Sequence, residues 1–438
     1  MTSSFQNSNF LPDDIRMKIA LISYGYPPDT PYGGIATYVY QVARMLNKRN
    51  HHVEVFTSSP YRYGTSIEDG IVVHRIVHSS QDYWSNQQDF VNYVGEAFAE
   101  RHKDIQFDVI EGPDYLADAR EAVRLVPDIP LVIKLHSPLF LVNEVNNSLN
   151  PRFLRIPALI NIRIFLGSLR RGIKPKWYRS YNCENDIERI HALEADEIAT
   201  PSLALGNKLV AEWGLDADKV AWVPCPYIPT DAFLNIPATT YTNTVTFIGR
   251  LEIRKGVLDL AKAIPKVLKQ RPDVKFRFAG TSTNSPDKKL NMQQYLEKNL
   301  RHYKNSIEFT GSYSADDLSS ILASTDICVF PSIWENFPLV CLEAMAAARG
   351  IIGSSSGGIP EMLNDGKAGL TIPPRNSAEI ADAILDLLER PEFRIQLGQL
   401  ARERVLTEYN IERIGALQEA SYYRAITRRQ AMGVRHLN

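Results

Sequence analysis

The feature that most limits the fold of this sequence is an alternation of short β-rich runs with helical patterns, which occurs in two series from residue 17 onward. Such alternation predicts parallel sheets with helices on both faces. A proline-rich, aperiodic segment at 224–238 separates the series. A chain of 438 residues is also too long for one ordinary core. We therefore expect an α/β protein with two doubly wound domains in tandem.

Each series predicts its own sheet. The expected strands are 18–23, 52–57, 71–77, 107–111, 131–136, 197–200 and 220–223 in the first series, and 244–248, 275–279, 307–309, 327–331, 350–353 and 368–372 in the second. The expected segments are a disordered or peripheral tail at 1–16, domains at 17–225 and 239–410, and a helix at 411–438. Ligands bind beyond the carboxyl ends of doubly wound strands, so we expect the site in a central cleft between the domains.

Charge and composition exclude several functional classes. Forty-nine Lys and Arg against fifty Asp and Glu give a net charge of -1, so no overall positive field attracts nucleic acid. No apolar stretch reaches the ~18 residues of a membrane span, and the N-terminus lacks the layout of a signal peptide. The four cysteines show no CxxC spacing. We expect a cytoplasmic protein with reduced thiols.

Two strand-to-helix turns carry candidate anion sites. Gly33 and Gly34 follow the first expected strand, where backbone N–H groups of a helix start attract anions, although a plain tight turn explains the pair equally. Arg250 and Lys255 occupy the matching turn of the second series. Two cations there oppose the helix macrodipole, which favours a bound diphosphate over the alternative of a solvated loop. No G-x-G-x-x-G follows the first strand, which argues against a dinucleotide oxidoreductase.

Two acidic residues mark a third segment, 331–344. Pro338 suits the first turn of a helix that Asn336 can cap, so Glu335 is expected just outside the helix and Glu343 within it. A Glu343 carboxylate buried among apolar neighbours needs hydrogen-bond donors, which ribose hydroxyls would supply. The alternative is an exposed helical glutamate.

Taken together, these segments resemble the retaining, GT-B-fold glycosyltransferases of family 4 over nearly the whole chain. Glu335 and Glu343 match the acidic pair of the family, which is separated by seven residues, and Gly249-Arg250 with Lys255-Gly256 matches its basic loop. The resemblance implies two Rossmann-like domains and a last helix that crosses back to the first. It also implies sugar transfer from a nucleotide-diphosphate sugar to a hydroxyl of a glycan, a lipid-linked sugar or a small molecule.

The resemblance also assigns roles to residues. Arg250 and Lys255 would hold the diphosphate, Glu343 the ribose and Glu335 the transferred sugar, while His136 would face the reacting sugar. The other donor-binding positions that it implies are Gly33, Gly34, Gly249, Phe337, Leu339 and Val340. No Asp-x-Asp lies at the end of a strand, so we expect the cations to replace a metal, with no cofactor besides the donor substrate.

The sequence departs from the family pattern at two places. Asn336 and Pro338 stand where the family often has glycines, and Pro338 removes one backbone donor from the helix start. Residues 224–227, Pro-Cys-Pro-Tyr, replace the usual asparagine-glycine turn, which predicts a different sugar selectivity. A GT-B-fold epimerase or phosphorylase would reuse the same clamp, and a degenerate, non-catalytic transferase subunit is a further alternative.

One segment, 149–179, carries eight basic residues and no acidic one. Interleaved apolar residues make it amphipathic, which is typical of helices that lie on anionic membrane surfaces. One hypothesis is peripheral attachment to a membrane that carries a lipid-linked acceptor. A mobile acceptor loop or an oligomer contact explains the segment equally.

Overall fold

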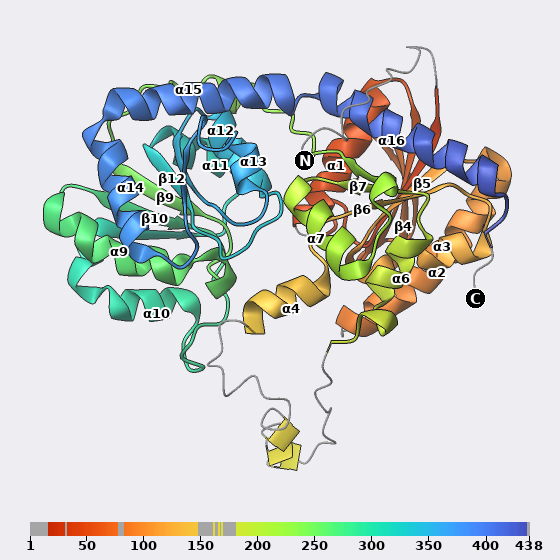
Figure 1. The fold of residues 1–438 in the computed structure, drawn as a ribbon, viewed down its shortest axis with the longest axis horizontal. Helices are drawn as coiled ribbons and strands as arrows, with labels where there is room; N and C mark the ends of the chain where they lie inside the picture. The colour runs from red at the N-terminus through yellow and green to blue at the C-terminus, as the bar shows by residue number, and fades with distance from the viewer. Residues whose placement is uncertain are drawn as a thin grey trace.

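The computed structural model describes residues 16–30, 33–77, 83–147, 161–162, 165–166, 168–169 and 181–435. The expected tail, apart from Arg16, and all eight basic residues of 149–179 lie outside the described residues. The chain forms two α/β domains that lie side by side, each built on its own mainly or wholly parallel sheet (Figure 1). The expected fold class is confirmed.

The N-terminal domain contains an eight-stranded sheet in the order β3-β4-β2-β1-β5-β6-β7-β8. Its strands are parallel except β3, which runs antiparallel to β4. The strands are β1 Lys18–Ser23, β2 His52–Ser59, β3 Gly64–Glu68, β4 Ile71–Val77, β5 Val109–Pro113, β6 Leu131–Lys134, β7 Glu197–Thr200 and β8 Val220–Trp222. The helices are α1 Gly34–Lys48, α2 Tyr83–Ile105, α3 Arg120–Leu125, α4 Leu139–Asn147, α6 Ile187–Glu194 and α7 Leu203–Trp213.

The C-terminal domain contains a six-stranded sheet in the order β11-β10-β9-β12-β13-β14, with all pairs parallel. The strands are β9 Thr244–Ile248, β10 Lys275–Ala279, β11 Ile307–Gly311, β12 Ile327–Phe330, β13 Gly350–Ser354 and β14 Leu370–Ile372. The helices are α8 Asp231–Leu234 in the connecting segment, then α9 Val257–Gln270, α10 Met292–Asn299, α11 Ala315–Ala323, α12 Leu339–Ala346, α13 Ile359–Met362, α14 Ser377–Glu389, α15 Pro391–Glu408 and α16 Ile411–Met432.

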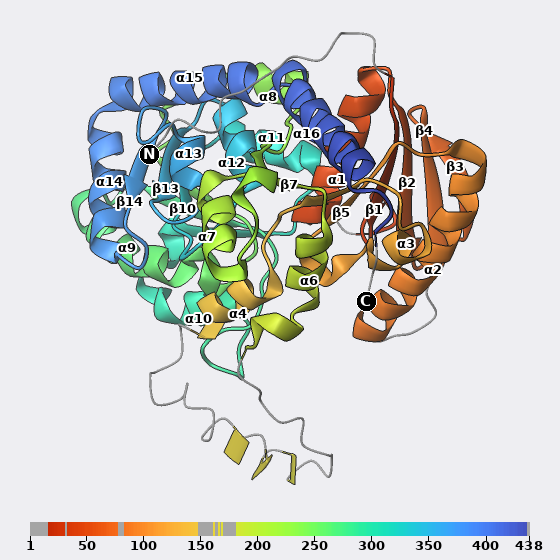
Figure 2. The same cartoon turned by 45° about the vertical axis from the view of Figure 1, so that its right-hand side comes forward.

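The last two helices join the domains. Helix α15 packs on the C-terminal domain, and α16 continues across the N-terminal domain, where it contacts β5, β6 and β7 (Figures 1 and 2). The buried carboxylate of Glu111 in β5 accepts hydrogen bonds from the hydroxyls of Tyr38 and Tyr422 and from the amide of Gln418. Helix α16 therefore completes the N-terminal domain.

Ion pairs also hold the C-terminal half of α16 and the residues that follow it. Asp196 pairs with Arg429 and Arg435, and Glu197 pairs with Arg424 and Arg428. Both carboxylates are buried and belong to the start of β7 or the residue before it.

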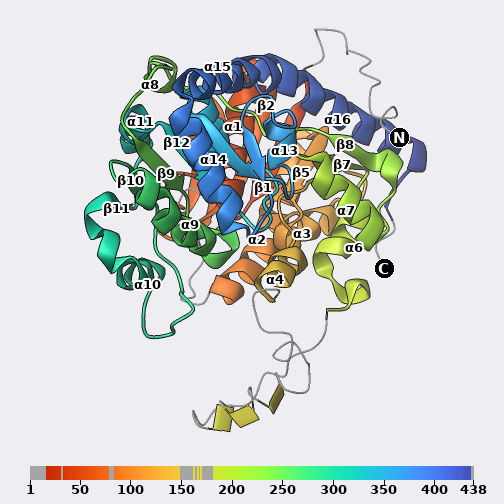
Figure 3. The ribbon, with the colours of Figure 1, turned by 60° about the vertical axis from the view of Figure 1, so that its left-hand side comes forward.

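The two sheets present the carboxyl ends of their strands to the same junction. The backbone of His136, just after β6, meets the side chain of Asn336, which follows β12. In Figure 3 the C-terminal domain lies in front of the N-terminal one. Among the helices of the described residues, none combines the length and the apolarity that a bilayer span requires.

Candidate active site at the domain junction

The basic loop after β9 is held in place by a glycine. Gly256 has φ = +73°, and a Cβ there would lie 1.9 Å from the carbonyl oxygen of Pro331. Only glycine combines this conformation with so close an approach. The basic loop therefore lies directly against the loop that follows β12 and carries Glu335.

The charges of the two loops meet at Glu335. Its Oε2 pairs with Lys255 Nζ and lies 3.4 Å from Arg254 Nη1. Burial alone would raise the pKa of Glu335, but the charges of Lys255 and Arg254 hold it below its ordinary value. Arg250 is more open: its side chain is 61% exposed, and its Nη2 lies 3.3 Å from Glu252. The site thus combines the carboxyl groups of Glu335 and Glu252 with three guanidinium or ammonium groups.

The helix that follows begins two residues later than a cap at Asn336 would place it. Helix α12 starts at Leu339, with Pro338 in the N-cap position, and Glu343 lies within it as expected. The expectation that Asn336 caps this helix is wrong. Its amide donates to the carbonyl of His136 and accepts from Ser202 Oγ at 2.6 Å, both in the other domain. Both polar atoms of the side chain are thus engaged by the other domain.

Three other expected donor positions surround the start of α12. Phe337 packs edge to face against Tyr409, with ring centroids 5.6 Å apart. Leu339 and Val340 are partly buried against the core. As the first two residues of α12, their backbone N–H groups precede the intrahelical hydrogen bonds. These N–H groups can therefore serve an anion.

Glu343 is partly buried, and one oxygen of its carboxyl group is enclosed by the protein. Within the part of the chain that the structure describes, its Oε2 has no hydrogen-bond donor. Burial raises its pKa to about 8. Burial and the nearby Glu343 also raise the pKa of Tyr227 and of Tyr313. Glu343 thus lies near the connecting segment and the β11–α11 loop, with one oxygen unused.

His136 lies on the N-terminal side of the junction. Burial, with the charge of Lys134, lowers its pKa to about 3, so the imidazole is neutral at physiological pH. Its Nε2 is buried, and no group among the described residues bonds to it. The ring packs against Tyr38, with centroids 5.1 Å apart.

Two buried carboxyl groups to which the sequence assigned no role hold the His136 loop. Asp114 Oδ1 accepts the backbone N–H of His136 at 2.9 Å, and Glu188 accepts those of Leu116 and Leu139. Burial raises the pKa of Asp114 to about 7 and, together with the charge of Asp114, that of Glu188 to about 8. Asp114, just after β5, gave no sequence signal beyond a polar residue at a strand end, whereas Glu188-Arg189, at the start of α6, is one of the stretches that resemble the family.

Because the folded protein binds the Asp114 proton more tightly than the unfolded chain does, stability falls as the pH rises from about 4 through about 7. We expect Asp114→Asn to flatten this slope, by an amount on the order of 2 kcal/mol between pH 5 and 8, while its amide oxygen still accepts the His136 N–H. Urea unfolding across this range measures the effect. Asp382→Asn, on the exposed face of α14, serves as control, and equal slopes for the wild type and Asp114→Asn would contradict the prediction.

Gly33 and Gly34 lie at the N-terminus of α1, in the other domain from the basic loop. Both are exposed, and a Cβ at either position would meet nothing within 4 Å. Neither has a positive φ, so the local fold does not require glycine at either position. Arg254, whose role the sequence analysis missed, lies between Arg250 and Lys255 in the same loop, and its charge was the available signal.

Comparison with known families matches each domain separately. The model described as "Glycosyltransferase Family 4" matches residues 32–230, and the model described as "Glycosyl transferases group 1" matches residues 242–390. The chain belongs to the glycosyltransferases of the group 1, family 4 type. The expected family and the tandem Rossmann-like GT-B fold are thereby confirmed.

Relatives of this glycosyltransferase match over most of their length. Glycogen synthase of Mycobacterium tuberculosis is 23% identical over 93% of this chain and 95% of its own. The sucrose-phosphate synthase structure from Thermosynechococcus elongatus has a TM-score of 0.69 and 24% identity, and covers 94% of this chain and 99% of its own. The structure of HepE of Anabaena in complex with UDP has a TM-score of 0.62 and 16% identity, and the match covers 93% of this chain and 99% of HepE.

Proposed function

We propose that this glycosyltransferase moves a sugar from a nucleotide-diphosphate sugar to a hydroxyl acceptor, with retention and without a metal ion. The observation that supports this most directly is the pairing of Arg254 and Lys255 with Glu335, with Arg250 in the same loop paired to Glu252, beside the first turn of α12. Three cations and two free helical N–H groups match a diphosphate in charge and geometry. The retaining course follows from the family resemblance.

In the proposed reaction, the bond between the anomeric carbon and the diphosphate oxygen breaks, and its electron pair remains on the diphosphate. The acceptor oxygen bonds to the anomeric carbon from the same face, and its proton passes to the departing phosphate oxygen. Arg250 and Lys255 stabilise the negative charge that develops there. The cations supply the positive charge that a metal would otherwise bring.

Lys255 changes partner during this cycle. Without donor its ammonium pairs with Glu335, which is 12% exposed at the side chain. A bound diphosphate competes for the ammonium, and Glu335 is then released to accept hydrogen bonds from hydroxyls of the sugar. Neutral His136, whose Nε2 lacks a protein partner among the described residues, faces the reacting sugar.

Calorimetric titration with the sugar conjugates of UDP, GDP and ADP in EDTA tests this proposal. One class of conjugate is expected to bind the wild type and to bind Arg250→Ala at least tenfold more weakly, since a charge-assisted hydrogen bond contributes about 1.5–3 kcal/mol. Absence of binding by every conjugate would refute the donor site. Binding that requires added Mg²⁺ would refute metal independence.

The same titration yields a pH prediction for Glu343. Ribose hydroxyls donate best to the ionised carboxylate, so binding favours loss of a proton whose pKa is about 8 in the free protein. Donor affinity is therefore expected to rise roughly tenfold from pH 6.5 to 8.5, with proton release. Glu343→Gln is expected to abolish the slope, whereas Glu379→Gln on the exposed start of α14 should keep it. A wild-type affinity independent of pH would contradict a ribose contact at Glu343.

A further inference from the structure

Two side chains of the C-terminal domain bind the N-terminal domain beside the donor site. Asn336 follows Glu335 directly, and its amide is bonded to His136 and Ser202. Glu361 in α13 receives the N–H groups of Leu203 and Ala204 at 2.7 and 2.8 Å. These contacts join loops that are 134 to 200 residues apart in the sequence.

Asn336 is firmly placed for this contact. Asn336 is 4% exposed. The loop that contains Gly358 packs tightly against it, because a Cβ on Gly358 would lie 2.0 Å from the Asn336 carbonyl oxygen. The N–H of Gly358 also donates to the carbonyl of Glu335 at 2.9 Å. The backbone that carries Glu335 is therefore fixed on one side by its own domain and on the other by Asn336.

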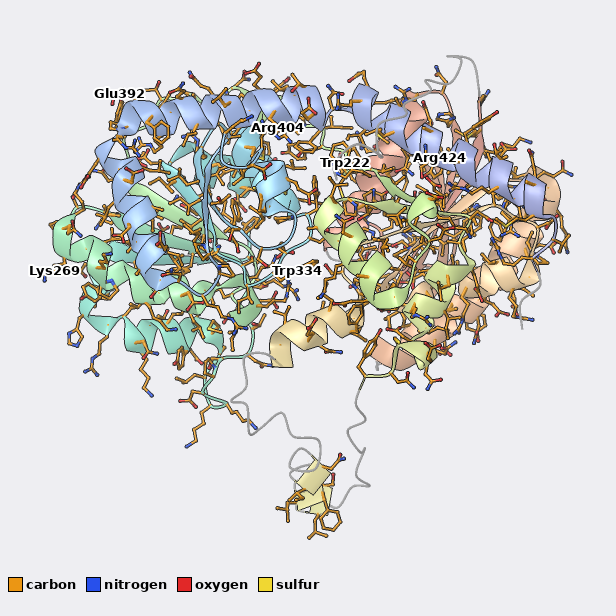
Figure 4. The ribbon with its side chains drawn as sticks, viewed as in Figure 1. Trp222, Lys269, Trp334, Glu392, Arg404 and Arg424 are labelled. Carbon is orange, nitrogen blue, oxygen red and sulfur yellow. The ribbon has the colours of Figure 1, made fainter. Side chains whose placement is uncertain are left out.

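The N-terminal N–H groups of helix α7 are accepted partly by its own cap residue and partly by the opposite domain. Ser202 Oγ accepts the N–H of Leu205 at 3.2 Å, and Glu361 accepts those of Leu203 and Ala204. A carboxylate at this end also complements the helix dipole. Arg404 holds α13 by donating to the carbonyls of Glu361 and Met362 (Figure 4). Both halves of the contact are thus braced within their own domains.

We propose that Asn336 and Glu361 form an interdomain clasp that keeps the two domains closed and sets the His136 loop at a fixed position against Glu335. Asn336 is a positioning residue, because it acts through its hydrogen bond to the His136 carbonyl and not by contact with a reacting atom. A glycine, which the family often has at this position, could not form these bonds.

The catalytic part of this inference rests on the proposed function, but the clasp itself is tested without catalysis. Small-angle X-ray scattering of the ligand-free protein compares the wild type with Asn336→Gly, Glu361→Gln and the double variant. Each single variant is expected to increase the radius of gyration, and the double variant at least as much. Asn291→Gly and Glu379→Gln serve as matched controls, because their side chains cap or begin helices within the C-terminal domain.

Measurements of kcat and donor Kd distinguish an interdomain clasp from a local defect at either substituted residue. Both single variants are expected to lower kcat roughly tenfold while the donor Kd stays within about threefold, because the basic loop, Glu343 and the start of α12 remain together on one domain. Hydrolysis of the donor should rise relative to transfer, as water enters an open junction. Unchanged scattering in both variants would overturn the clasp, as would a kcat loss confined to Asn336→Gly. If the wild type transfers no sugar, the scattering comparison still decides the clasp.

Discussion

Lys255→Met is expected to lower the rate of sugar transfer by about 10²- to 10³-fold, the loss typical of removing one preorganised donor from a developing negative charge. Lys255 holds Glu335 in the free protein and is proposed to hold the departing diphosphate in the reaction. Methionine keeps the length and the apolar stem of the side chain. The loss should therefore appear in kcat, measured by release of the nucleotide diphosphate.

Stability should change little, because Arg254 still lies beside Glu335 when Lys255 is absent. Lys262→Met in α9 is the matched control, since Lys262 is 67% exposed and pairs only with Asp259 among the contacts described. Its activity should equal that of the wild type. A Lys255→Met enzyme with more than about a tenth of wild-type kcat would show that the diphosphate is stabilised elsewhere.

Glu111→Ala is expected to destabilise the N-terminal domain by about 3–5 kcal/mol, the usual cost of breaking a buried charged network by removing one partner. Tyr38, Gln418 and Tyr422 would lose their common acceptor. The buried Lys134 ammonium, 4.7 Å from the centre of the Tyr38 ring, would also lose the nearby negative charge. Calorimetry should show a lower melting temperature for the transition of this domain.

Glu308→Ala gives the comparison for an exposed pair. Glu308 bonds to Arg277 but is 57% exposed, so its removal should cost less than about 1 kcal/mol. Equal effects of the two substitutions would mean that α16 does not depend on Glu111. If Glu111→Ala instead lowered the melting temperature of the C-terminal domain, the prediction that Glu111 stabilises the N-terminal domain would be contradicted.

The two sheets were predictable because buried parallel strands are continuous apolar runs. Strand β3 escaped because it lies at the edge, with residues 64–68 alternating between exposed and partly exposed, so no apolar face marks it. The connecting segment looked irregular, yet Phe233 of α8 and Tyr227 are buried in the core. A proline-rich composition hides such packing, since proline disrupts periodicity without preventing burial.

Some residues of the candidate site were likewise predictable from the sequence, and others were not. Two short segments carry four of the predicted site residues, so their spacing within each segment made them recognisable. These residues are Arg250 and Lys255 in the first segment and Glu335 and Glu343 in the second. The partners of Asn336 lie in the other domain, and local rules therefore assigned it to the nearest helix. Contacts that depend on how two domains meet leave no periodic pattern in one sequence.

The position of α16 fixes when the first domain can finish folding. Glu111 and the Asp196-Glu197 pair leave the ribosome long before residues 411–435, which supply most of their side-chain donors, have been synthesised. During that interval Glu111 keeps the hydroxyl of Tyr38 and Asp196 keeps the N–H of Leu131, but the donors from α16 and Arg435 are missing. A chain that stops before α16 is therefore expected to have a less stable N-terminal domain than the intact protein, because these buried carboxylates lack donors.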